Sequence, residues 1–363
     1  YMVVKITNTL PKNIDIIIYL TCKINKNSIE KALDIKLPKT LFNNFTGDYN
    51  DIKKQYFNDK IVLIGGLGKV HKCTNENIRK MVANCINSVS YEGKNICFFL
   101  MKSEDHLKID AEVVSALLTL YNFDKYKTSD KPNQPKNVYF YSKSKKYNDQ
   151  VKKSIIIGNS VNKVRDLINE PGNKLNPDTY VKYLKKMGTQ NKFTVEIINH
   201  LKLKKLGMGG IEAVCQGSKY KPRLAVIKYI KDKNKKNIVL VGKGVTFDAG
   251  GINIKYNDFS DMKSDMTGSA VVFGVIDCIA KLGLKRNIIG LLPIVENMPD
   301  ANAIRPGDII KSYNKKTIEV IDTDAEGRLI MADALAYAKK YNPSLIIDIA
   351  TLTGQAESIT NHK

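Results

Sequence analysis

Three short stretches in the second half of the chain carry the residue types that could perform chemistry. They read VGKGVTFDAGGINIK at 241–255, SDMKSDMTGSA at 260–270 and IDTDAEGRL at 321–329. Each places carboxylates close to glycine and to a lysine or an arginine, a composition that fits a site for metal ions. Each stretch also has a simpler interpretation, in which the same acids are turn or helix-cap residues that face water.

Taken one at a time, the simpler interpretations are favoured. Asp248 precedes Ala-Gly-Gly and is typical of a turn residue. Asp265 could cap the helical pattern that follows it, and Asp324 with Glu326 could cap the next one. Lys243, between two glycines, could be a solvated lysine or a phosphate-binding lysine, although the spacing GxxxxGKS or GxxxxGKT is absent.

Considered together, the three stretches favour a common site, because the predicted strands around them would place them close together in space. Apolar strand patterns end at Lys243, near residue 321 and near residue 350. If these strands are neighbours in a doubly wound sheet, the carboxylates that follow them converge at one edge of that sheet. Carboxylates in close proximity repel one another unless cations neutralise them.

The ligand types indicate which cations and which chemistry fit such a cluster. Oxygen-rich ligation suits Mg, Mn or Zn. The four histidines, at positions 71, 106, 200 and 362, lie outside the three stretches, which excludes a histidine-based zinc site. Two divalent ions about 3.5–4 Å apart, bridged by carboxylates, polarise a carbonyl group and activate water for hydrolysis.

Apolar runs rich in Ile and Val alternate with longer helical patterns, which predicts an α/β fold. We expect a smaller N-terminal α/β domain over 1–148, a linking helix and hinge over 149–175, and a larger α/β domain over 176–363 with a mostly buried mixed sheet. The expected strands are 13–22, 60–65, 95–101, 137–141, 193–198, 222–230, 237–244, 287–295 and 344–350, and the expected helices are 76–91, 108–122, 149–169, 177–187, 266–282 and 326–341.

The formal charge of +22 over 363 residues is spread evenly along the chain. Only six of the 58 basic residues are Arg, the type best suited to bidentate phosphate and base contacts. A diffusely basic surface is therefore favoured over a dedicated nucleic-acid domain. Weak, salt-sensitive binding to polyanions is the alternative that this charge leaves open.

The six cysteines form no CxxC pair, and several lie in apolar runs such as NICFFLM. Such cysteines behave as small buried hydrophobes, and a chain of this length needs no disulfides, which favours a reducing compartment. No apolar run approaches the ~20 residues that span a bilayer, and the first residues lack a signal-peptide pattern. We therefore expect a cytoplasmic protein without a membrane segment.

Read in order, the stretches and their neighbours resemble the successive motifs of the leucyl aminopeptidase family. The motifs are GKGVTFDAGGINIK, MKSDMTGSAVV, ENMPDANAIRPGD, DTDAEGRLIMADAL and DIATLTG. VRDLINEPGNKLNP and CQGSKYKPRLAVIKY fit the family too, so the resemblance covers about residues 160–354. It implies a two-metal exopeptidase that acts on peptides and is usually a homohexamer, with an N-terminal α/β domain and a C-terminal catalytic domain.

Carried over by motif position, the resemblance implies a metal-binding role for five residues. Asp248 and Glu326 bridge two divalent ions, zinc or manganese, with magnesium or cobalt as alternatives. Lys243, as a neutral amine, and Asp265 complete the tighter site. Asp324 completes the more exchangeable site through its side chain and its backbone carbonyl.

The resemblance also implies the residues that act on the substrate. Lys255 polarises the scissile carbonyl and stabilises the oxyanion, and Arg328 holds a bicarbonate that serves as general base. The free α-amine of the substrate coordinates one metal, which explains selectivity for N-terminal, preferably apolar, leucine-like residues. Met262, Thr351, Leu352 and Gly354 line the side-chain pocket and bind substrate backbone, although Met262 could equally be a core residue.

Three positions depart from the family pattern without removing a ligand. Ala249 stands where Ser is usual, Thr267 where Gly is common and Asp322 where Asn is usual. Family members also continue beyond DIATLTG, so we expect a catalytic domain that is incomplete at its C-terminus. Together with the charge, this leaves an alternative function open: a catalytically weak or inactive oligomeric scaffold, or a nucleic-acid-binding relative.

Overall fold

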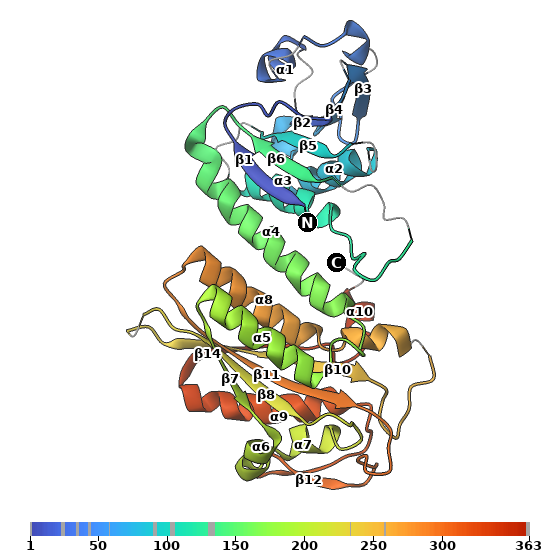
Figure 1. Cartoon of the computed structure of the whole chain (residues 1–363), viewed down its shortest axis with the longest axis vertical. Coiled ribbons are helices and arrows are strands. Elements are labelled where there is room, and N and C mark those ends of the chain that lie inside the picture. The colour runs from blue at the N-terminus through green and yellow to red at the C-terminus, as the bar shows by residue number, and fades with distance from the viewer. Residues whose placement is uncertain are drawn as a thin grey trace. The chain divides into compact units, whose positions relative to one another are not determined.

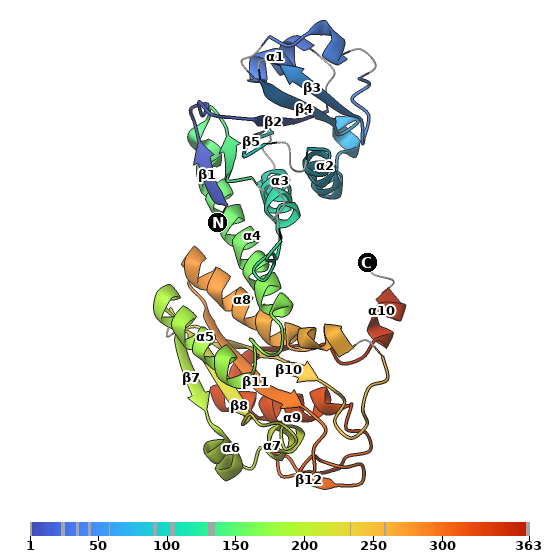
Figure 2. The same cartoon turned by 45° about the vertical axis from the view of Figure 1, so that its right-hand side comes forward.

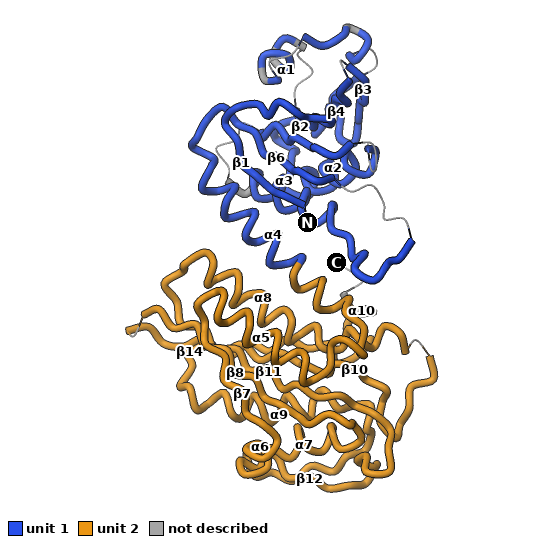
Figure 3. Tube along the Cα trace, in the orientation of Figure 1, with its two compact units in different colours: residues 1–162 blue, residues 163–363 orange. Residues whose placement is uncertain are grey.

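The computed structural model describes residues 2–22, 26–33, 36–42, 45–57, 59–89, 93–101, 106–129, 135–232, 234–257 and 259–360. The chain divides into two compact units, residues 1–162 and 163–363 (Figure 3). Each unit has its own six-stranded sheet covered by helices (Figure 1). This confirms the expected fold class, a smaller N-terminal α/β domain followed by a larger one. The division falls inside helix α4 (Asn148–Asn169).

The sheet of the first unit has the strand order β1-β6-β5-β2-β4-β3. Neighbouring strands are parallel except for the pair β3 and β4. The central strand β2 is apolar on both sides because packed elements cover both faces of the sheet. The strands are β1 (Val3–Thr7), β2 (Ile16–Thr21), β3 (Ile52–Phe57), β4 (Lys60–Gly66), β5 (Asn95–Phe99) and β6 (Asn137–Tyr141).

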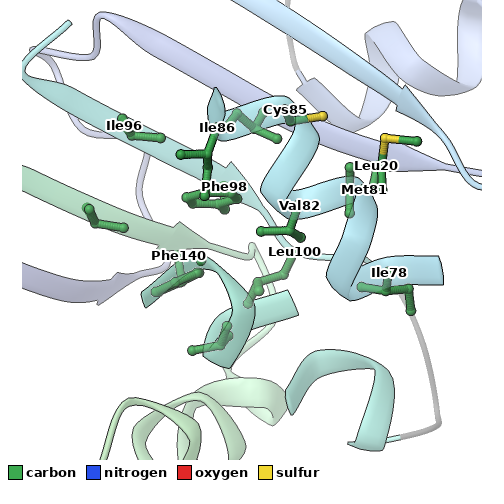
Figure 4. Close-up of a cluster of buried hydrophobic side chains, with 14 of the residues drawn as sticks. Leu20, Ile78, Met81, Val82, Cys85, Ile86, Ile96, Phe98, Leu100 and Phe140 are labelled. Carbon is green, nitrogen blue, oxygen red and sulfur yellow. The ribbon is translucent and has the colours of Figure 1, made fainter. Parts of the chain in front are cut away.

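Helix α1 (Lys26–Leu33) packs on one face of this sheet, and α2 (Asn75–Asn87) and α3 (His106–Thr119) pack on the other. Helix α2 begins at a capping box formed by Thr74 and Asn77. Its apolar side chains then recur every three or four residues and fit against the aromatic rings of β5 and β6 (Figure 4). The first unit therefore has one buried apolar cluster on each face of its sheet.

The second unit holds a mixed sheet of order β14-β9-β11-β8-β7, with β10 paired to β11. Strands β9, β10, β11 and β14 are parallel, whereas β7 and β8 run antiparallel to their neighbours. The strands are β7 (Thr194–Ile198), β8 (Arg223–Tyr229), β9 (Asn237–Gly242), β10 (Gly244–Asp248), β11 (Asn287–Asn297) and β14 (Pro343–Ile349).

Helices cover both faces of this second sheet (Figure 2). Helices α5 (Pro177–Asn191) and α8 (Thr267–Leu282) lie on one face. Helices α6 (His200–Leu206), α7 (Gly209–Val214) and α9 (Glu326–Ala338) lie on the other. A short helix, α10 (Gln355–Thr360), follows β14.

One expectation about the sheet is wrong. The strand pattern near residue 321 does not belong to the main sheet, but forms a separate hairpin of β12 (Ile309–Lys311) and β13 (Thr317–Glu319). The polar turn between them, with Lys315 in the left-handed region at φ 71°, closes the two strands on each other. Of the three strands that were expected to be neighbours, the two that end at Gly242 and Ile349 do pair in the main sheet.

None of the six cysteines forms a disulfide bond. Cys97, in the apolar run NICFFLM, is buried as predicted, whereas Cys278 is half-buried. Among the helices of the described ranges, none is both long and apolar enough to cross a membrane.

Glu112, in α3, is a fully buried carboxyl group of the first unit. Its Oε2 accepts a hydrogen bond from the Met101 N–H at 3.2 Å, and its Oε1 has no hydrogen-bond partner in the part of the chain that is described. Burial raises the pKa of Glu112 to about 8, and the Met101 bond opposes this only in part. The folded state therefore holds this proton more tightly than the unfolded state does.

This raised pKa predicts how the stability of the first unit depends on pH. Because the unfolded chain loses the proton near 4.5 and the folded chain near 8, the free energy of unfolding should fall as pH rises between these values. Glu112→Gln keeps the shape but cannot titrate, so its free energy of unfolding should fall less over that range. Hydrogen exchange of the α3 amides, compared between the two proteins at each pH, measures this. An identical pH dependence in both proteins would show that Glu112 is not buried as described.

Candidate metal centre

The candidate site lies where the chain leaves the carboxyl ends of β9, β10 and β14. Lys243 directly follows β9, and its backbone N–H donates to the carbonyl of Ile349 at the end of β14 at 3.0 Å. Asp248 is the last residue of β10, and Glu326 is the first residue of α9. The topology thus brings together residues that are up to 83 positions apart, from 243 to 326.

Lys243 joins two of the predicted ligands. Its Nζ lies 2.8 Å from Asp265 Oδ1 and 2.8 Å from Glu326 Oε1, and it donates to the Thr351 carbonyl at 2.8 Å. Only 2% of Lys243 is exposed, so its interpretation as a solvated loop lysine is wrong. Gly327 makes this approach possible, because a Cβ there would stand 2.7 Å from the Lys243 Nζ.

Lys255 joins the other two predicted ligands. Its Nζ lies 2.9 Å from Asp248 Oδ2 and also contacts Asp324 Oδ1. The loop that carries Lys255 leaves β10 through Gly250 and Gly251, which have φ of 89° and 67°. Glycine adopts this left-handed backbone without the steric cost that other residues have.

The donor set fits divalent cations. Asp248, Asp324 and Glu326 each offer a carboxylate oxygen, and these oxygens lie within 4.8 Å of one another. Four carboxylates against two ammonium groups leave a formal surplus of two negative charges (4 − 2). In the described part of the chain, Asp265 Oδ2 and Glu326 Oε2 are buried without a hydrogen-bond partner. Buried oxygens of this kind are costly unless a cation or water binds them.

Burial raises the pKa values of three of these acids, and the crowding of like charges adds a smaller contribution. Burial raises the pKa of Glu326 to about 8, and the nearby Asp248 and Asp265 add to the effect that Lys243 opposes. Burial likewise raises the pKa of Asp265 to about 6 and that of Asp324 above its usual value. Burial would lower the pKa of Lys243, but the charges of Glu326 and Asp265 raise it above its usual value.

The remaining predicted residues surround the cluster to different degrees. Thr351 donates through Oγ1 to Asp265 Oδ1 at 2.7 Å, so it touches the site directly. Arg328 is exposed on the first turn of α9, two residues beyond Glu326. Leu352 and Gly354 are exposed in the segment after β14, and Met262 is half-buried in a short 3-10 helix (Phe259–Ser264).

The structure shows which of the simpler roles, helix cap or turn residue, each acid has. The N-caps of α8 and α9 are Met266 and Ala325, and neither makes a side-chain cap bond, so the capping roles expected for Asp265, Asp324 and Glu326 are wrong. Asp248 does have its expected turn role, because its Oδ1 accepts from the Gly250 N–H at 3.0 Å. Asp322 is exposed, and its Oδ1 accepts from the Asp324 N–H at 2.8 Å.

The fold and the site define an α/β protein with a carboxylate-rich centre suited to divalent cations. Two family profiles match the chain: "Cytosol aminopeptidase family, catalytic domain" over residues 162–363, and "Cytosol aminopeptidase family, N-terminal domain" over residues 43–130. The chain therefore belongs to the cytosol aminopeptidase family. This confirms the resemblance that the sequence motifs carry.

Curated relatives extend over most of the chain. A protein of Wigglesworthia glossinidia brevipalpis named "Probable cytosol aminopeptidase" is 35% identical over 95% of this chain and 71% of its own length. Proteins with the same name from Phytoplasma mali and Hamiltonella defensa are each 37% identical, over 86% and 83% of this chain. The chain spans 66% and 63% of those two relatives.

Solved structures share the fold. "Bottromycin maturation enzyme BotP in complex with Mn" matches 96% of this chain and 74% of its own, with a TM-score of 0.81 and 26% identity. "Bottromycin maturation enzyme BotP" matches 95% of this chain and 73% of its own, with a TM-score of 0.79 and 26% identity. That enzyme is therefore similar to this chain across both compact units.

The buried, partly unpaired carboxylates predict that divalent cations stabilise the second unit. Adding Mn²⁺ to chelator-treated protein should raise its melting temperature, because the ion binds the folded state only. Glu326→Gln should lose most of that shift, since it removes the charge from a carboxyl group that is 2% exposed. Differential scanning fluorimetry measures the shift.

Glu319→Gln serves as the control, because Glu319 is an exposed acid on β13. It should keep the full Mn²⁺ shift. Equal shifts in wild type and Glu326→Gln would place the bound Mn²⁺ outside this cluster.

Proposed function

We propose that this chain is a metal-dependent aminopeptidase that hydrolyses N-terminal, preferably apolar, leucine-like residues from peptides by a two-metal mechanism. One observation carries the proposal: Lys243, Asp248, Asp265, Asp324 and Glu326 gather in one cluster with two unpaired carboxylate oxygens among them. Membership in the cytosol aminopeptidase family supports it, and so does the Mn complex of the similar enzyme BotP.

In this proposal the five residues hold two divalent ions, zinc or manganese, with magnesium or cobalt as alternatives. Asp248 and Glu326 would be ligands to both ions, Lys243 and Asp265 would complete the tighter site, and Asp324 would complete the more exchangeable one. The Lys243 Nζ must lose its proton before its lone pair can coordinate. Two cations nearby would lower the pKa of Lys243 and so favour that loss. The two carboxylates that it contacts in this structure have the opposite effect, because they raise its pKa.

Lys255 and Arg328 are the proposed catalytic residues. When bound, the two ions supply Lewis-acid activation of the scissile carbonyl and of a water molecule. The carboxylates of Asp324 and Asp248 keep the pKa of Lys255 well above its usual value despite its burial. The Lys255 ammonium can therefore donate a hydrogen bond to the carbonyl oxygen as negative charge develops there. The planar fork of Arg328 could hold a bicarbonate, which would supply the general base.

Substrate binding is assigned to the residues beside the cluster. Thr351, Leu352 and Gly354 follow β14, and Thr351 already contacts both Lys243 and Asp265. Their segment could bind substrate backbone, while Leu352 and Met262 offer apolar contact to the N-terminal side chain. The exposed surface of Leu352, 46%, is available for this contact.

The remaining features of the proposal follow from the family. They are a homohexamer in the cytoplasm with a catalytic domain over 176–363, a linking segment over 149–175 and an N-terminal domain over 1–148. The alternative, an inactive oligomeric scaffold or nucleic-acid-binding relative, is supported by the charge of +22. The two functions differ in whether the metal-loaded protein turns over peptides.

Hydrolysis of leucine amide or leucine p-nitroanilide by protein loaded with Mn²⁺ or Zn²⁺ tests the proposal. We expect turnover that a chelator abolishes and that Asp265→Ala and Glu326→Ala lose. Lys255→Ala should lower kcat by about 10²–10³-fold, the usual cost of losing one oxyanion donor, while metal content stays the same. N-acetyl-leucine amide should not be cleaved, because its amine is blocked.

A salt-dependent shift of DNA in a gel, with no peptidase turnover by metal-loaded protein, would contradict the proposal. That result would instead support the scaffold or nucleic-acid-binding alternative.

A further inference from the structure

We infer that Asn297 is a positioning residue for the metal centre: its side-chain amide joins the two ligand-bearing loops and fixes which oxygen of Asp248 faces the cations. The inference rests on the proposed function, since it concerns how the cluster is held for metal binding. Asn297 is the last residue of β11 and is 1% exposed.

The amide nitrogen of Asn297 makes one bond to each loop. Nδ2 donates to Asp248 Oδ1 at 2.9 Å and to the backbone carbonyl of Thr323 at 3.1 Å. Asp248 ends β10, and Thr323 immediately precedes Asp324. One planar NH₂ group, whose two hydrogens point in different directions, thus connects a ligand side chain with the backbone of the loop that carries two further ligands.

The bond to Asp248 also selects the oxygen that remains for cations. Asp248 Oδ1 accepts from both Asn297 Nδ2 and the Gly250 N–H, at 2.9 and 3.0 Å. Oδ2 faces the Lys255 Nζ instead, at 2.9 Å. With Oδ1 held by two donors, the carboxylate cannot rotate freely, and Oδ2 stays directed at the cluster. Such outer partners orient metal ligands and typically contribute about 10–100-fold to metal affinity.

Thr323 strengthens the same junction. Its side-chain Oγ1 contacts the Gly250 carbonyl at 2.7 Å and accepts from the Asn253 N–H at 2.8 Å. Gly251 fits beneath both residues, because a Cβ there would stand 2.9 Å from Asn297 Oδ1 and 3.0 Å from Thr323 Oγ1. The two loops are therefore packed together through buried polar groups, and Asn297 is the group that also touches a predicted ligand.

Asn287, at the opposite end of β11, provides a matched control. It is 3% exposed, and its Nδ2 donates to the carbonyls of Asp232 and Lys235. Its Oδ1 accepts from the Lys231 and Asp232 N–H groups. Like Asn297 it is a buried amide that holds a loop, but its bonds stay within 231–235, which contains no predicted ligand.

The experiment titrates Mn²⁺ into full-length, chelator-treated protein and follows free Mn²⁺ by electron paramagnetic resonance. Asn297→Ala should weaken Mn²⁺ binding by about 10–100-fold, whereas Asn287→Ala should bind as wild type does. Thr323→Val, which keeps the shape but loses the hydroxyl, should weaken binding in the same direction. Circular dichroism confirms that each variant is folded; if Asn297→Ala is not, Asn297→Leu, which keeps the shape and loses the same two hydrogen bonds, is compared with Asn287→Ala and decides the outcome.

Wild-type affinity in the folded Asn297→Ala variant, or in Asn297→Leu when that variant decides, would overturn the inference. So would an equal loss in Asn287→Ala, which would indicate a general effect of losing a buried amide. A wild-type protein that binds no Mn²⁺ would overturn the proposed function as well, and is distinguishable because binding is then absent before any substitution is made.

Discussion

The repulsion among four carboxylates at one edge of the sheet is the constraint on which the site depends. Asp248, Asp265 and Glu326 are buried and Asp324 is half-buried, so water screens their charges poorly, and two lysines supply only half of the compensating charge. Two divalent cations carry four positive charges, which match the four carboxylates without the lysines and would free the lysines for other roles. Burial raises the pKa of Glu326 to about 8, and the charges of Asp248 and Asp265 add to this effect.

The surrounding fold holds these like charges together. Strands β9 and β14 place Lys243 next to Ile349, and β10 delivers Asp248 beside the end of β11. Hydrogen bonds from the Gly250 N–H and from Asn297 then hold the Asp248 carboxylate, and the Thr351 hydroxyl holds that of Asp265. A site built on strand ends and pinned loops keeps its ligands in place before a cation arrives, which reduces the ordering that binding requires.

Much of the fold was predictable from sequence because the signals are local. Buried strands such as β9 and β11 are continuous apolar runs, and each predicted ligand lies in a motif of a few residues. The elements that were missed have weak local patterns. Strand β3 reads IKKQYF with two adjacent lysines at the edge of its sheet, and β10 has only five residues and begins with glycine.

The contacts of the site could not be predicted because they join distant residues. The amide of Asn297 bonds to positions 49 and 26 residues away. In the sequence it stands in ENMPD with nothing to distinguish it from a turn asparagine. The same holds for the choice of partners by Lys243 and Lys255, which divide the four carboxylates into two pairs. Which lysine meets which acid depends on how the loops pack, and motif spacing carries no information on that.

The most direct test of this account is anomalous diffraction at the manganese edge from crystals grown with Mn²⁺. The account predicts two anomalous peaks within the cluster, bridged by Asp248 and Glu326, with the Lys255 Nζ displaced from both of its carboxylates. The account would be contradicted by crystals grown at the same Mn²⁺ concentration that show no anomalous peak in the cluster. In such crystals Lys243 and Lys255 would each still contact their two carboxylates.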